Sequence, residues 1–120
     1  MKAIILAAGQ GKRLRPLTNR TPKCLVKIQK KSILERQINL FKNQNINEIY
    51  VVGGYLSEML DNSPDYELII NNRYETTNMV YSLMCAKNKL FDDVIISYGD
   101  ILFSEDLLKK IINSKEKISL

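Results

Sequence analysis

The sequence predicts an α/β fold in three layers, with a mostly parallel sheet between two layers of helices. Segments rich in Ile, Val and Leu alternate along the chain with segments of helical periodicity. The strand segments are nearly continuous in apolar residues, which is typical of strands that are buried on both faces of a sheet. The chain has 120 residues, of which 45% are hydrophobic and 26% charged, so residues 1–120 are predicted to form one domain with a real core.

Four segments are predicted to be strands. They span residues 2–7, 48–53, 66–70 and 93–98, and each is rich in Ile, Val or Leu. In parallel α/β sheets, ligands bind beyond the carboxyl ends of the strands. The glycine loop that begins at Gly9, after the first strand, and Asp100, after the fourth, are therefore predicted to lie at the same edge of the sheet.

Four helices are predicted between and after these strands. The first has the clearest start, because Ser32 and Glu35 have the spacing of a capping box and apolar residues follow at helical spacing. A short helix is expected over 55–61 and a longer one over about 78–90. The last helix is expected from Ser104, whose hydroxyl can cap it.

The connection after the first strand, which runs to about residue 31, is long enough to indicate a function. It opens with Leu6-Ala7-Ala8-Gly9-Gln10-Gly11-Lys12-Arg13-Leu14. Small residues let backbone N–H groups approach a ligand and the cations neutralise negative charge, so this motif favours a polyphosphate. The dinucleotide fingerprint needs a glycine in place of Leu14, and the P-loop needs Ser or Thr in place of Arg13. The alternative is a glycine turn with only a structural role.

Composition excludes several classes of function. The chain has no histidine, which rules out Ser-His-Asp and Cys-His catalysis and His-ligated zinc, whereas transfer at phosphorus needs mainly positioning and charge stabilisation. The net charge of +5 comes without an aromatic-interleaved basic stripe, so a small anion is favoured over nucleic acid. Cys24 and Cys85 are predicted to be reduced thiols of a cytoplasmic protein. The N-terminal apolar run is too short for membrane insertion.

The glycine loop resembles the signature loop of the nucleotidyltransferases that act on sugar phosphates and related small phosphates. The pattern Leu-Ala-Ala-Gly-x-Gly-x-Arg-Leu-x-Pro-Leu-Thr, with Pro-Lys a few residues on, is complete here as Leu6 to Thr18 followed by Pro22-Lys23. The resemblance implies a Rossmann-like, GT-A-like fold and an Mg²⁺-dependent transfer of a nucleotidyl group. Members of this family are usually longer, so we expect residues 1–120 to be a truncated, nucleotide-binding N-terminal part of such a domain.

The resemblance also assigns roles to matching residues. Arg13 and Lys23 are implied to contact the nucleotide phosphates and the reacting phosphate, where fixed cations stabilise the transition state more than the ground state. Asp100 is implied to bind Mg²⁺, which favours one or two carboxylates together with phosphate oxygens. From the residues alone, Lys23 could instead be a solvated loop lysine, and Asp100 could instead turn the chain or cap the next helix. The other predicted nucleotide-binding residues are Leu6, Ala7, Ala8, Gly9, Gly11, Lys12 and Asn78.

The segment Thr77-Asn78-Met79-Val80-Tyr81-Ser82-Leu83 narrows the resemblance. Sugar-1-phosphate members carry a Gly-Leu-Ala-type segment here, whereas this one resembles the cytidylyltransferases that activate phosphocholine and similar phosphorylated amines or amino acids. The bland alternative for Asn78 is an N-cap. Tyr74 and Tyr81 are either stacking or cation–π partners of a ligand, or core and rim residues.

Together these observations predict a transferase that uses CTP and a small phosphorylated acceptor, with products for the decoration of surface polysaccharide or lipid. Two alternatives stay open. One is a sugar-1-phosphate uridylyl- or thymidylyltransferase. The other is a catalytically incomplete module that binds a nucleotide without releasing pyrophosphate.

Overall fold

The computed structural model describes residues 1–9, 16, 19–60, 63–91 and 93–114. Its centre is a sheet of four strands: β1 (Lys2–Ala7), β4 (Glu48–Gly53), β5 (Glu67–Ile70) and β6 (Val94–Tyr98). The strands lie in the order β5-β4-β1-β6, and each neighbouring pair is parallel. The predicted sheet is therefore confirmed, and the predicted strand ends agree with the observed ones to within a residue.

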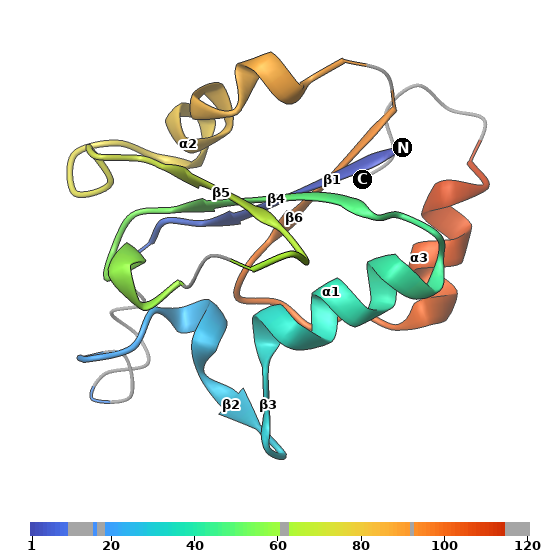
Figure 1. Ribbon diagram of the computed structural model, residues 1–120, viewed down its shortest axis with the longest axis horizontal. Coiled ribbons are helices and arrows are strands. Elements are labelled where there is room, and N and C mark those ends of the chain that lie inside the picture. The colour runs from blue at the N-terminus through green and yellow to red at the C-terminus, as the bar shows by residue number, and fades with distance from the viewer. Residues whose placement is uncertain (10–15, 17–18, 61–62, 92, 115–120) are drawn as a thin grey trace.

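Helices cover both faces of this sheet (Figure 1). α1 (Ile33–Asn43) and α3 (Glu105–Ile112) lie on one face, and α2 (Met79–Cys85) lies on the other, which confirms the three-layer arrangement. Two predicted caps are present: the Oγ atoms of Ser32 and Ser104 accept hydrogen bonds from the backbone N–H groups of Glu35 and Leu107. No helix in the described ranges combines the length and the hydropathy that a membrane span requires.

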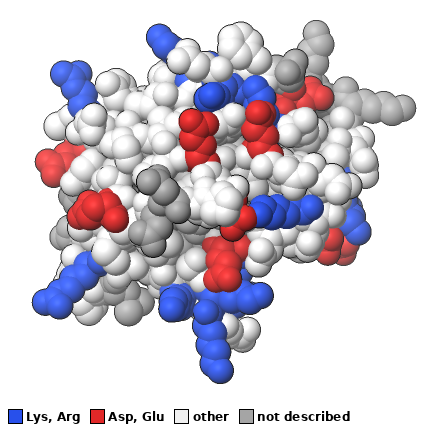
Figure 2. All heavy atoms as spheres, viewed as in Figure 1, with Lys and Arg blue, Asp and Glu red and all other residues white. Residues whose placement is uncertain are grey.

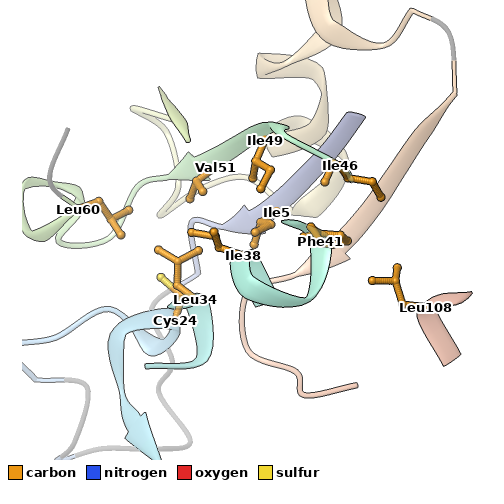
Figure 3. Packing of buried hydrophobic residues seen from close by; sticks show 11 residues of the cluster. Ile5, Cys24, Leu34, Ile38, Phe41, Ile46, Ile49, Val51, Leu60 and Leu108 are labelled. Carbon is orange, nitrogen blue, oxygen red and sulfur yellow. The ribbon is translucent and has the colours of Figure 1, made fainter. Parts of the chain in front are cut away.

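The sheet divides the core in two, because successive side chains of a strand point to opposite faces. On the face of α1 and α3, Ile5 and Val51 belong to a cluster of buried residues with Ile38, Phe41 and Leu108 (Figure 3). On the face of α2 a smaller cluster contains Ile4, Leu6, Tyr50, Val52 and Ala86. The continuous apolar strands of the sequence are thus explained by burial on both sides.

The strand order creates a switch point beside β1. The chain runs outward from β1 to β4 and β5, and α2 then returns it to β6 on the other side of β1. In open α/β sheets, ligands bind beyond the carboxyl ends of the strands at such a point. The topology therefore predicts that a ligand would bind near the segments that follow β1 and β6.

Two helix predictions are wrong in extent. The helix expected over 55–61 is only a 3₁₀ turn, η3 (Ser57–Met59), because Leu56 before it has a left-handed φ of 51°. α2 ends at Cys85 and does not reach residue 90. The chain turns at Ala86, which is 1% exposed against the sheet, and continues in a second 3₁₀ turn, η4 (Lys87–Lys89).

The connection between β1 and α1 contains structure that the sequence pattern did not predict. It holds the 3₁₀ turn η2 (Lys23–Leu25) and a hairpin of β2 (Lys27–Ile28) and β3 (Lys31–Ser32). The hairpin turn places Gln29 and Lys30 at φ of 52° and 72°, a conformation for which Gly or Asn is usual. Arg36 of α1 supports this turn by donating hydrogen bonds to its backbone carbonyls.

Charges of both signs are spread over the face of the molecule that Figure 2 shows. Basic side chains gather at its lower edge, where Figure 1 places the β2–β3 hairpin. Lys27, Lys30 and Lys31 of this hairpin are exposed. Part of the net charge of +5 is thus carried by a projecting hairpin, separate from the ion pair described below.

Candidate functional site

The carboxyl ends of β1 and β6 are joined by backbone contacts around Gly99. The N–H of Gly99 donates to the carbonyl oxygen of Leu6 at 2.8 Å. A side chain would not fit there, since a Cβ at position 99 would lie 2.9 Å from the Cβ of Ala7 and 3.2 Å from that of Cys24. Glycine therefore allows the ends of β1 and β6 to meet the turn η2.

Two predicted site residues meet at this junction. Lys23 Nζ donates to Asp100 Oδ2 at 2.8 Å, although the residues are 77 positions apart in the sequence. Their side chains are 27% and 37% exposed, so solvent and ligands can reach the pair. An ion pair this open contributes at most about 1 kcal/mol to stability. Its significance is that the predicted phosphate-binding cation and the predicted metal ligand lie at one point.

The backbone of Lys23 is fixed by its neighbours. Pro22, in extended conformation, caps η2, and Cys24 is 2% exposed within the larger core cluster. Burial raises the pKa of the Cys24 thiol to about 12, so this thiol stays neutral near pH 7 and anchors the turn rather than reacting. Cys24 and Cys85 are both free, as predicted.

The environment of Asp100 fits a carboxylate ligand of Mg²⁺. The carboxylate follows the end of β6 and is 37% exposed, and it already pairs with one cation, the Lys23 ammonium. Within the described ranges, no group of three or more His, Cys, Asp or Glu side chains surrounds a possible metal position. Mg²⁺ is commonly held by one or two carboxylates together with substrate phosphates. The donor set therefore fits an ion that is shared with a phosphate ligand.

In the described part of the glycine motif, Leu6 and Ala8 are buried and Gly9 is exposed. Ala8 is 3% exposed, and its carbonyl oxygen accepts a hydrogen bond from the N–H of Tyr55 at 3.2 Å. Gly9 is exposed, and a Cβ there would meet nothing within 4 Å, so a ligand could approach its backbone directly. Gly11, Lys12 and Arg13 lie outside the described residues, and their contacts with the nucleotide stay predictions.

The segment after β5 is organised by a buried amide. Asn71 is 1% exposed; its Nδ2 donates to Ser82 Oγ at 2.9 Å and to Thr77 Oγ1 at 3.2 Å. Its Oδ1 accepts from the N–H of Arg73 at 2.9 Å. Sequence reasoning missed this role, although an asparagine that follows a strand and bonds the backbone two residues on is a known turn signal.

Asn78 acts as the N-cap of α2, which was the alternative to a ligand contact. Its Oδ1 accepts from the N–H of Tyr81 at 3.2 Å. Asn78 also lines an open hollow of about 590 Å³ together with Tyr81, which is 40% exposed, and the segment 75–77. Tyr74 packs edge-on against Tyr55, with ring centroids 6.1 Å apart, which fits the rim alternative for this residue.

Comparisons with known proteins show the family to which the chain belongs. The sequence-family model of the MobA-like NTP transferase domain matches residues 3–118 of this chain. A CTP:phosphoglutamine cytidylyltransferase from Campylobacter jejuni is 45% identical over 100% of this chain and 51% of its own length. A choline-phosphate cytidylyltransferase from Streptococcus pneumoniae is 42% identical over 86% of this chain and 46% of its own length. The chain thus spans about half the length of the curated relatives it matches.

A solved structure leads to the same family. The CTP:phosphocholine cytidylyltransferase structure from Streptococcus pneumoniae matches with a TM-score of 0.76 and 39% sequence identity. The match covers 88% of this chain and 49% of that one. Since the family model matches nearly the whole chain and the fold agrees, the chain belongs to the MobA-like NTP transferase domain family and is similar to its cytidylyltransferases.

Proposed function

We propose that this protein transfers a cytidylyl group from CTP to a small phosphomonoester and releases pyrophosphate. The acceptor would be phosphocholine or a related phosphorylated amine or amino acid, and the product would serve the decoration of surface polysaccharide or lipid. The proposal is supported by the 45% and 42% identity to cytidylyltransferases of phosphoglutamine and phosphocholine. We also propose that the protein acts in the cytoplasm.

In the proposed reaction, an oxygen of the acceptor phosphate attacks the α-phosphorus of CTP. The new P–O bond forms as the bond between the α-phosphorus and the bridging oxygen breaks, and that oxygen leaves with pyrophosphate. Charge builds up on the non-bridging oxygens of the α-phosphate. Lys23, and by the family pattern Arg13, would lie against these oxygens and stabilise the transition state.

Asp100 would hold Mg²⁺ in this scheme. When bound, the ion would reduce the repulsion between the nucleotide and acceptor phosphates and help to align them. The observation that carries the proposal is the 2.8 Å contact between Lys23 and Asp100 at the switch point of the sheet. The contact brings an ammonium and a carboxylate together at the edge where ligands bind in such folds, which supports the proposed roles of Lys23 and Asp100.

The proposal is tested by a thermal-shift panel of CTP, UTP, dTTP, ATP and GTP, each with and without Mg²⁺. A ligand that binds only the native state at about 100 times its Kd adds about 2.7 kcal/mol of stability. We expect an Mg²⁺-dependent rise of Tm with CTP, followed by pyrophosphate release when phosphocholine is added. A rise with UTP or dTTP instead would favour the sugar-phosphate alternative. No rise with any nucleotide, in a protein that melts cooperatively, would contradict the proposal.

A further inference from the structure

The turn that contains Asp100 accepts hydrogen bonds from a side chain of α1, a helix that is far from it in the sequence but packed against it in the fold. Gln37, in the middle of α1, is 0% exposed. Its Nε2 donates to the carbonyl oxygens of Tyr98 and Ile101, both at 2.8 Å, and its Oε1 accepts from Ser97 Oγ at 2.5 Å. These partners lie on both sides of Gly99 and Asp100. The primary amide therefore uses both of its protons and its oxygen on the end of β6.

A buried amide is costly unless its polar groups are paired, so its presence at this position needs a reason. β6 ends at Tyr98, and the carbonyl groups of the turn need donors once the strand has ended. Gln37 donates to the carbonyl of Ile101 and to that of Tyr98, which also accepts a longer hydrogen bond from the Ile101 N–H at 3.4 Å. A leucine or methionine would fill a similar volume on α1 but would leave both carbonyls without these donors.

The same turn is held from the opposite side by β1. Gly99 N–H donates to the carbonyl oxygen of Leu6, and Gly99 lies close to Cys24, the neighbour of Lys23 in the sequence. Gln37 restrains the turn further, because it forms hydrogen bonds with Tyr98 before Gly99-Asp100 and with Ile101 after them. The side chain of Asp100 itself is exposed and depends on this backbone for its direction.

We propose that Gln37 is a positioning residue, which acts through the Tyr98–Ile101 turn to aim the carboxylate of Asp100 at Lys23 and at a phosphate-bound Mg²⁺. This inference rests on the proposed function for the role of the metal. The hold of Gln37 on the turn is independent of that function. Residues that orient a metal-ligating side chain without touching the metal typically change metal affinity or activity by about 10- to 100-fold when they are removed.

The test compares wild type with Gln37→Met, which keeps the approximate volume and removes both donors. Two quantities are measured: hydrogen exchange of the Gly99 amide, and the Mg²⁺ concentration that gives half of the CTP response. In Gln37→Met we expect exchange of the Gly99 amide to accelerate and the half-saturating Mg²⁺ concentration to rise about tenfold. Ser97→Ala, which leaves both donors of Gln37 in place, should give a smaller change in the same direction.

Two control variants separate positioning from loss of stability. Gln44→Met removes another hydrogen bond of a glutamine side chain at the end of α1, from Nε2 to Glu105 Oε1 at 2.9 Å, away from the turn. Ile38→Ala destabilises the core beside Gln37 and removes none of the hydrogen bonds between Gln37 and the turn. Both controls should leave the half-saturating Mg²⁺ concentration near the wild-type value.

The inference is overturned if Gly99 exchange in Gln37→Met is no faster than in the control variants. It is also overturned if exchange accelerates while the Mg²⁺ response matches that of Ile38→Ala, because Gln37 would then be a structural residue only. Failure of the proposed function has a different signature: wild type itself would show no Mg²⁺-dependent response to any nucleotide. In that case, an unchanged Gly99 exchange in Gln37→Met would still refute the hold of Gln37 on the turn, and a faster one would support it.

Discussion

Two loops at the carboxyl edge of the sheet are each organised by a buried amide, but they are built differently. After β5, Asn71 bonds Arg73, Thr77 and Ser82, which are at most 11 residues away in the sequence. After β6, Gln37 bonds residues that are 60 to 64 positions away. The first loop is folded by its own segment, whereas the second depends on the packing of α1 against the sheet. Substitutions at the two loops should therefore differ in their effects on turnover and on the free energy of unfolding.

The largest effect is expected at the β6 end, from Lys23→Ala. Removal of the ammonium should lower turnover by about 100-fold or more, because charge on the reacting phosphate loses a fixed partner. The fold should persist, since an exposed ion pair contributes at most about 1 kcal/mol. Pyrophosphate release and the melting temperature are measured together. Lys30→Ala, in the exposed hairpin, is the matched control, and equal turnover in the two variants would refute the role of Lys23.

Asp100→Asn should come next in size. The variant keeps the shape of the side chain but removes the charge that would hold Mg²⁺, so the dependence of turnover on Mg²⁺ should be lost. The measurement is a titration of turnover with Mg²⁺. Asp93→Asn changes an exposed aspartate at the other end of β6 and should behave as wild type. A normal metal response in Asp100→Asn would exclude this aspartate as the ligand.

The β5 end should respond mainly in stability. Asn71→Ala leaves the buried Ser82 hydroxyl without this partner and should lower the free energy of unfolding by about 1–3 kcal/mol. Urea denaturation measures the loss. The exposed neighbour Asn72 provides the control, and Asn72→Ala should stay within about 0.5 kcal/mol of wild type. Equal stability of the two variants would show that the local network does not hold this loop.

The smallest effect is expected from Asn78→Ala, which removes the cap of α2 and should cost about 1 kcal/mol. Asn78→Ser, which keeps a capping oxygen, should restore most of that stability. The response to CTP then separates the two roles of this residue. If Asn78 is only a cap, Asn78→Ser should also restore the CTP-induced shift of Tm. A restored fold with a lost shift would instead support the predicted contact with the nucleotide.

The sequence predicted the features that depend on local signals better than those that depend on contacts between distant segments. Apolar runs predicted the strands, and the caps at Ser32 and Ser104 predicted two helix starts, because these signals are local. The glycine loop and Asp100 were expected at the same sheet edge, because the carboxyl ends of parallel strands lie together, but the direct contact between Lys23 and Asp100 was not predicted. The hairpin turn at Gln29-Lys30 was missed because its left-handed residues are not Gly or Asn.

Gln37 was missed for a reason that depends on tertiary contacts. It lies on the buried face of α1 with Ile33, Leu34, Ile38 and Phe41, at a position where the helical pattern calls for an apolar residue. A polar residue on an apolar face is the signal that was available. Its partners, however, follow from the packing of α1 against the end of β6, which a pattern along one segment does not contain.

The contact between Lys23 and Asp100 also has a consequence for how tightly a nucleotide can bind. An ammonium has three N–H donors, so Lys23 can keep its contact with the Asp100 carboxylate at 2.8 Å while another donor binds a phosphate. Even a ligand that breaks this exposed ion pair loses only about 1 kcal/mol or less, which is under a tenfold loss in affinity. Because each charge holds the other, neither side chain has to be ordered from a free rotamer when the ligand binds.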